Sequence, residues 1–107
     1  WLWHTKYSRN MAAEKKLQDK VIADLESMSP KVLVFKLMKA NINDLADVWF
    51  IHPKGTACVE LKSPGKKPRP GQEAMLNRIN ATGGARAFWC DNWDGWMKIK
   101  EELMLFF

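Results

Sequence analysis

Residues 47–62 read DVWFIHPKGTACVELK, and this stretch decides the fold. β-Branched and aromatic side chains favour extended backbone over 47–52 and 56–62. Pro53-Lys54-Gly55 lies between these two runs and has the composition of a tight connection. The stretch therefore predicts two strands that are joined as a hairpin.

The second strand of this hairpin carries two charged side chains on one face. Successive side chains of a strand point to opposite faces, so Glu60 and Lys62 lie side by side while Val59 and Leu61 enter a core. Asp47 adds a carboxylate at the start of the neighbouring strand. This combination suits hydrolysis with a divalent metal, because Mg²⁺ prefers oxygen ligands and retains several waters. The alternative is an exposed Glu–Lys pair that forms a weak salt bridge.

Helical and extended patterns alternate on either side of the hairpin. Leu17, Val21, Leu25 and Met28 recur at steps of four, four and three, which places them on one helical stripe. The order α-β-β-β-α-β-α, without an internal repeat, favours an α/β fold with a mixed four-stranded sheet flanked by helices. We expect helices over 13–28, 70–82 and 93–103, and strands over 31–38, 47–52, 56–62 and 86–90.

The net charge is concentrated in one part of the chain. The 107 residues include 17 Lys and Arg against 12 Asp and Glu, for a formal charge of +5. Residues 54–86 hold seven of those bases and two of those acids, so this segment alone accounts for the whole excess. A basic segment around the Glu60 strand favours an anionic partner over general basicity.

Length and composition bound the class of protein. A chain of 107 residues suits one compact domain. No apolar run approaches the roughly 20 residues of a membrane span, so we expect no membrane partner. Cys58 and Cys90 are too few for a disulfide framework and form no CxxC, which favours reduced thiols in an intracellular protein. No GxSxG, GxxxxGK[ST] or GxGxxG is present.

The chain divides at Met11. Residues 1–10 are basic and aromatic without clear periodicity, and we interpret them as a tag, a leader or a flexible arm. They lack the apolar stretch of a signal peptide. Residues 11–107 are expected to form the single domain.

Three further polar residues fall where apolar ones are expected. Glu14 continues the stripe of the first helix, although a first-turn glutamate is also favoured by the helix dipole. Gln72 lies on the sheet-facing side of the second helix, where it could equally be a capping or solvent-facing residue. Lys36 shares a strand face with Val32 and Val34, where a lysine suggests a nearby carboxylate or phosphate. Alternatively, Lys36 lies at a sheet edge and its side chain extends into solvent.

Together these positions resemble a known family. The pattern Glu14…Lys36…Asp47…Glu60-Leu61-Lys62…Gln72 is similar to that of the PD-(D/E)XK nuclease superfamily and, within it, the VRR-NUC (virus-type replication-repair nuclease) domain. The similarity covers about residues 14–92, including VFKLMKANINDLADVWFIHPKG, ACVELKSPGKKPRPGQEAMLNRI and TGGARAFWCDN. One position departs from it: the family usually has proline before the first aspartate, and here that residue is Ala46.

The resemblance implies a fold and a metal-dependent activity. It implies a restriction-endonuclease-like αβββαβ core and a Mg²⁺- or Mn²⁺-dependent phosphodiesterase that acts on DNA. The metal would be held by Asp47 and Glu60 through their side chains, by the Leu61 carbonyl, and by Glu14 directly or through water. Lys62 would be the catalytic lysine. Gln72 would support Lys62 or the edge of the site, and Lys36 would face the scissile phosphate or the acidic cluster.

The resemblance also implies partners. Lys66, Lys67 and Arg69, in the Pro/Gly-rich loop after the ELK strand, are placed to contact DNA phosphates. Branched DNA such as a Holliday junction, in a DNA-repair setting within bacterial or phage-infected cytoplasm, is the expected substrate. We also expect a homodimer, because the C-terminal segment is rich in large apolar residues. These are Trp93, Trp96, Leu103, Leu105, Phe106 and Phe107.

Two other functions remain open at this point. The chain could be a DNA-binding or assembly module of the same fold without catalysis, or another PD-(D/E)XK nuclease of exonuclease or restriction type. The presence of Asp47, Glu60 and Lys62 together favours an enzyme, because a non-catalytic copy usually loses at least one of them.

Overall fold

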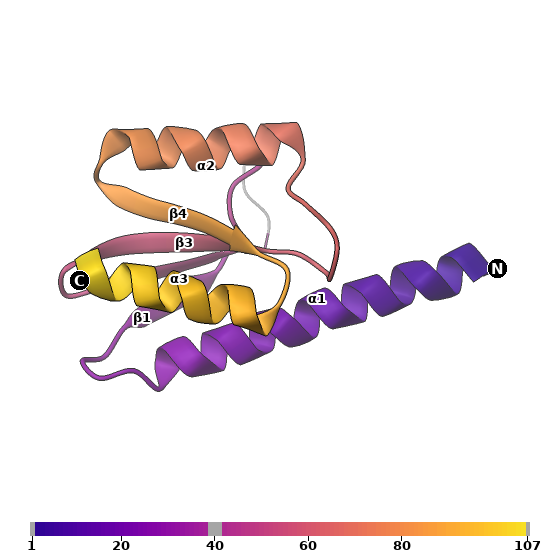
Figure 1. Cartoon of the computed structure of the whole chain (residues 1–107), viewed down its shortest axis with the longest axis horizontal. Coiled ribbons are helices and arrows are strands. Elements are labelled where there is room, and N and C mark those ends of the chain that lie inside the picture. The colour runs from indigo at the N-terminus through magenta and orange to yellow at the C-terminus, as the bar shows by residue number, and fades with distance from the viewer. Residues whose placement is uncertain (1, 39–41, 107) are drawn as a thin grey trace.

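The computed structural model describes residues 2–38 and 42–106 and contains one four-stranded sheet with three helices (Figure 1). The α/β class and the order of elements agree with the prediction from sequence. The elements are α1 (Leu2–Glu26), β1 (Leu33–Lys36), β2 (Val48–His52), β3 (Gly55–Leu61), α2 (Pro70–Thr82), β4 (Ala85–Cys90) and α3 (Trp93–Phe106).

The sheet is mixed, with strand order β1-β2-β3-β4. β1 pairs with β2 and β2 with β3 in antiparallel fashion, whereas β3 and β4 are parallel. A parallel pair needs a crossover connection, and α2 supplies it. The hairpin register pairs Val48 with Val59 and His52 with Gly55, so the predicted hairpin is confirmed.

Helices cover both faces of the sheet. α1 and α3 lie on one face and α2 lies on the other (Figure 1). Val59 and Leu61 are fully buried under α1 and α3, as the alternation along β3 predicts. Cys58, one residue from Val59, faces α2 with Leu76. Cys90 belongs to the α1/α3 side, and both thiols are free and buried.

The first helix is longer than its apolar periodicity indicates. α1 begins at Leu2 instead of residue 13, and its N-terminal turns extend past the sheet (Figure 1). Residues 2–10 contain no proline or glycine, and adding turns to a helix that is already packed costs far less than nucleating one. Whether this segment is a tag or leader stays a prediction. No helix in the described part of the chain is both long and apolar enough to cross a bilayer.

A polar network joins α1 to α3. Trp96 is fully buried, contacts the Phe50 ring edge-on at 6.2 Å between centroids, and donates its indole N–H to Asp24 Oδ2 at 2.8 Å. Lys100 Nζ lies 2.8 Å from the same oxygen. Burial alone would raise the pKa of Asp24, but hydrogen bonds from Lys100 and Trp96 lower it.

These contacts correct part of the expected partner surface. Trp96 and Leu103 are buried in the core of the single chain, so they are not available to a second copy. Trp93 is half-buried and packs on the same core, and Leu105 is exposed. The side chains of Phe106 and Phe107 lie outside the described residues.

Candidate active site

The expected carboxylates meet where β2 begins and β3 ends. Asp47 directly precedes Val48 of β2, whose partner Val59 directly precedes Glu60 in β3, so the two carboxylates lie close together. α1 and the start of α2 approach this point from either side. These carboxylates line an open cleft of about 640 Å³, which we call the site cleft. Its lining residues are Asn10, Met11, Glu14, Asp47, Glu60, Lys62, Ser63, Lys66, Lys67, Arg69 and Gln72.

Glu60 is the most deeply buried charged group of the cleft, with 3% of its surface exposed. Its Oε1 lies 3.6 Å from Lys62 Nζ and accepts a hydrogen bond from Gln72 Nε2 at 3.4 Å. Its Oε2 has no hydrogen-bond partner among the described residues. Burial, followed by the nearby charge of Asp47, raises the pKa of Glu60 to about 8, although Lys62 opposes the shift.

Asp47 is held by a residue that the sequence interpretation missed. Gln18, buried in α1 with 6% exposure, donates Nε2 to Asp47 Oδ2 at 3.2 Å. The signal was available, because Gln18 follows Glu14 by four residues and therefore shares its helix face. The Asp47 backbone carbonyl also accepts the Leu37 amide at 2.7 Å, which fixes the chain just before β2. Ala46, directly before Asp47, is fully buried beneath α2.

Glu14 enters the cluster from α1. It is half-buried, and burial followed by the charge of Asp47 raises its pKa, while Lys62 and Lys36 act in the opposite direction. Glu14 therefore lies within electrostatic range of both other carboxylates and both lysines. The expectation that it turns toward the site, rather than serving as a first-turn dipole partner, agrees with this geometry.

Gln72 joins the first turn of α2 to the site. Its Oε1 accepts the Arg69 amide at 2.9 Å, and its Nε2 donates to Glu60. We expected support for Lys62 or for the edge of the site, and the contact found is with Glu60. The neighbouring Gly71 allows close packing, because a Cβ there would collide with the Asp44 carboxylate from the β1–β2 connection.

The basic loop lies on the same cleft as the carboxylates. Lys66 and Lys67 are exposed and line the cleft, and Arg69 forms an ion pair with Asp44 at 3.5 Å. The loop is anchored at Gly65, which has φ 82° and donates its amide to Asp91 Oδ2 at 2.9 Å. The structure thus brings all three predicted DNA contacts to the site.

Lys36 lies in a second cleft of about 430 Å³, the adjoining cleft. The two clefts share Met11, Glu14 and Asp47, so they meet at the carboxylates. Lysines therefore lie on both sides of the acidic cluster. Lys36 remains exposed, and Val34 on the same strand face packs against the core, as the pattern predicts.

The donor set fits a hard divalent cation. Buried Glu60 lies near two further carboxylates, those of Asp47 and Glu14, and one close ammonium, that of Lys62, and such an excess of acidic groups is what a cation offsets. Leu61 could contribute only its carbonyl, because its side chain is in the core. Among the described residues no group of three His, Cys, Asp or Glu side chains, these three carboxylates included, lies close enough together to hold a metal ion by itself. A Mg²⁺ site with fewer side-chain ligands would rely on water for the rest.

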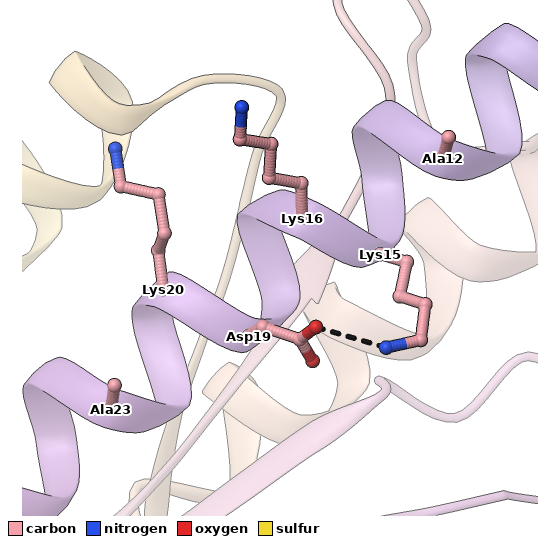
Figure 2. Close-up of a pocket in the computed structure, with 6 residues that line it drawn as sticks. All are labelled: Ala12, Lys15, Lys16, Asp19, Lys20 and Ala23. Atoms are coloured by element: carbon pink, nitrogen blue, oxygen red, sulfur yellow. Dashed lines mark hydrogen bonds and ion pairs between the residues drawn. The ribbon is translucent and has the colours of Figure 1, made fainter.

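A separate hollow on α1 lacks this chemistry. It runs along the exposed side of the helix and is lined by Ala12, Lys15, Lys16, Asp19, Lys20 and Ala23 (Figure 2). Lys15 pairs with Asp19 at 2.9 Å within the helix, and Lys20 lies 4.6 Å above the Trp93 ring. The hollow includes none of the converging carboxylates, and we assign no site to it.

The chain was also compared with known proteins. No protein-family model matches it, and no curated protein sequence matches it.

Proposed function

We propose that the chain is a metal-dependent, structure-selective DNA endonuclease. The observation that carries the proposal is the convergence of three carboxylates, those of buried Glu60, Asp47 and Glu14, in a cleft bordered by lysines. A metal-dependent nuclease needs both kinds of group, because carboxylates hold the cation and lysines bind the DNA phosphates. The proposed family is the VRR-NUC branch of the PD-(D/E)XK nucleases, and the strand order and crossover helix are compatible with its restriction-endonuclease-like core.

The proposed reaction adds water across one P–O bond of the DNA backbone. Asp47, Glu60 and the Leu61 carbonyl would hold Mg²⁺ or Mn²⁺, with Glu14 binding directly or through water. Bound there, such a cation would supply a coordinated water of lowered pKa and would offset charge on the phosphate.

Protein groups supply the remaining steps. Lys62, whose side chain is 15% exposed and lies beside Glu60, orients the attacking water and offsets the charge that develops on the phosphate oxygens. Gln18 and Gln72 each donate to one carboxylate, which leaves its second oxygen for the cation. Lys66, Lys67 and Arg69 bind flanking phosphates without reading sequence.

The arrangement of the two clefts favours internal cleavage over attack on an end. They meet at the carboxylates, and lysines lie on both sides, so a strand can continue in either direction from the reacting phosphate. Branched DNA, the Holliday junction included, is the substrate that we propose, in an intracellular setting compatible with the two free thiols.

The test compares four-way junction, flap and linear duplex DNA in Mg²⁺, Mn²⁺ or EDTA. We expect cleavage of branched DNA by the wild type with metal, and loss of at least 100-fold in Lys62→Ala. Lys98→Ala, which removes an exposed lysine of α3 outside both clefts, is the matched control. Equal cutting by wild type and Lys62→Ala, or no cutting of any substrate with metal, would refute the mechanism. Binding without cutting would instead favour the non-catalytic module.

We further propose a homodimer. Leu33 and Phe35 of β1 and Ile51 of β2 are 62%, 40% and 43% exposed, which makes the sheet, and not the buried Trp96, the surface available to a second copy. Apolar side chains gathered on paired strands favour a covering partner. Light scattering at micromolar concentration tests this, and a monomeric mass would contradict it.

A further inference from the structure

The adjoining cleft combines apolar and cationic side chains in a way that the site cleft does not. Met11 of α1 and Met38, just after β1, both line it and are 54% and 83% exposed. Two large apolar side chains from different elements therefore face one hollow while remaining open to solvent. Leu37, half-buried between β1 and Met38, adds to the apolar wall.

Charge complements this apolar wall. Glu14 and Asp47 line one end of the same cleft, and Lys15 and Lys36 line it too; Lys15 pairs with Asp19, so exposed Lys36 is the cation left for a ligand that lies away from the carboxylates. A ligand that matches the lining would therefore carry a flat apolar group and a negative charge. The volume, about 430 Å³, lies in the range of sites for small ligands. A nucleotide unit, with its aromatic base and its phosphate, has both properties.

The position of the cleft specifies which nucleotide this would be. Because the adjoining cleft meets the site cleft at Glu14 and Asp47, its occupant would be next to the phosphate that reacts. Inside a duplex the faces of a base are covered by its neighbours. Methionine side chains contact aromatic rings favourably through sulfur and can separate stacked bases, and both interactions need an exposed base face.

We propose that the adjoining cleft binds one unpaired base of a DNA strand, next to the phosphate held at the carboxylates. The inference rests on the proposed function and narrows its substrate to DNA with an unpaired nucleotide at the cleavage point. Met11 and Met38 hold the base face, and Lys36 contacts a phosphate beside it. Structure selectivity then arises because fully paired DNA offers no base to this cleft.

The experiment measures binding in EDTA, so that cleavage does not interfere. Fluorescence anisotropy compares an end-labelled single-stranded oligonucleotide with a blunt duplex of the same sequence. Met11→Ala/Met38→Ala should weaken single-strand binding about tenfold, the size expected for two sulfur–ring contacts, and duplex binding less than about twofold. Met11→Leu/Met38→Leu keeps the apolar bulk but removes both sulfur atoms, so it should lose part of the single-strand binding, less than the double alanine variant loses. The matched control, Met97→Ala/Met104→Ala, removes two exposed methionines of α3 and should change neither.

The outcomes separate this inference from the proposed function. If the double alanine variant binds both DNA forms as the wild type does, or loses both equally, the base-binding cleft is refuted, whereas cleavage by the wild type in Mg²⁺ would still support the nuclease. If the selective loss is found but the wild type cuts nothing in Mg²⁺ or Mn²⁺, the cleft stands and the nuclease proposal fails. Circular dichroism confirms that each variant is folded.

Discussion

Replacing Glu60 with glutamine should stabilise the metal-free protein, and the gain should grow with pH. The pKa of the Glu60 carboxyl rises from 4.5 to about 8 on folding, mainly through burial and then through the charge of Asp47. Between these two values the unfolded chain releases a proton that the native state retains. The protonated Glu60 carboxyl therefore makes its full contribution to the free energy of unfolding of the wild type below pH 4.5, and this contribution is lost as pH rises through 8.

The size of this stability difference follows from the interval between the pKa values of Glu60 in the unfolded and folded states. Each unit of difference in pKa corresponds to about 1.4 kcal/mol, so an interval of roughly 3.5 units sets an upper value of about 5 kcal/mol at pH 8 and above. Glutamine has no proton to lose. Its amide oxygen can accept from Gln72 as Oε1 does now, and its amide nitrogen can donate to the Asp47 carboxylate. The variant should thus match the wild type near pH 4.5 and exceed it by a few kcal/mol at pH 8.

Urea unfolding in EDTA between pH 4.5 and 9 measures the difference, with Glu101→Gln, an exposed glutamate of α3, as the matched control. A second arm adds Mg²⁺ at pH 8. The cation should stabilise the wild type by about 2.7 kcal/mol at 100 times its dissociation constant and should leave Glu60→Gln almost unchanged. A stability difference that does not vary with pH, or a Glu60→Gln variant less stable than the wild type at pH 8, would refute the reasoning.

Three further changes test other parts of the structure. Gly71→Ala should lower the free energy of unfolding by up to about 1 kcal/mol, because its Cβ meets the Asp44 carboxylate, which must move aside. A double-mutant cycle with Asp44→Ala should recover part of that cost, and additive effects would contradict the contact. Trp96→Phe should cost about 1–3 kcal/mol in urea unfolding because it removes the indole N–H that joins α3 to α1, and an unchanged midpoint would contradict the network. Lys66→Ala/Lys67→Ala should reduce the slope of log binding constant against log salt for duplex DNA by about 1.8, and an unchanged slope would place the phosphate contacts elsewhere.

Local patterns predicted the elements that position the site. The alternation along β3 sends Val59 and Leu61 into the core and leaves Glu60 on the opposite face, because a strand has a period of two and one face must be buried. Proline and glycine at either end of α2 marked its limits, since each residue restricts the backbone locally. These features depend only on neighbours in the chain.

Other features depend on contacts between distant segments and were not predictable in the same way. The helical spacing places Gln18 on the same face as Glu14, but its hydrogen bond to Asp47 depends on α1 passing the start of β2, which no local pattern predicts. Trp96 fits a core position as well as an interface position by its spacing, and only packing against Phe50 decides between them. The extension of α1 to Leu2 was not predictable from apolar periodicity, because residues 2–12 show none.

The two cysteines can report how the layers of the molecule come apart. Cys58 lies beneath α2 and Cys90 beneath α1 and α3, so each thiol is shielded by a different layer. Burial raises the pKa of Cys58 to about 12 and that of Cys90 to about 11, so neither thiol is reactive while the protein is folded. The rate at which an alkylating reagent modifies each cysteine therefore measures the opening of one layer. Equal rates would mean that the molecule opens as a single cooperative unit.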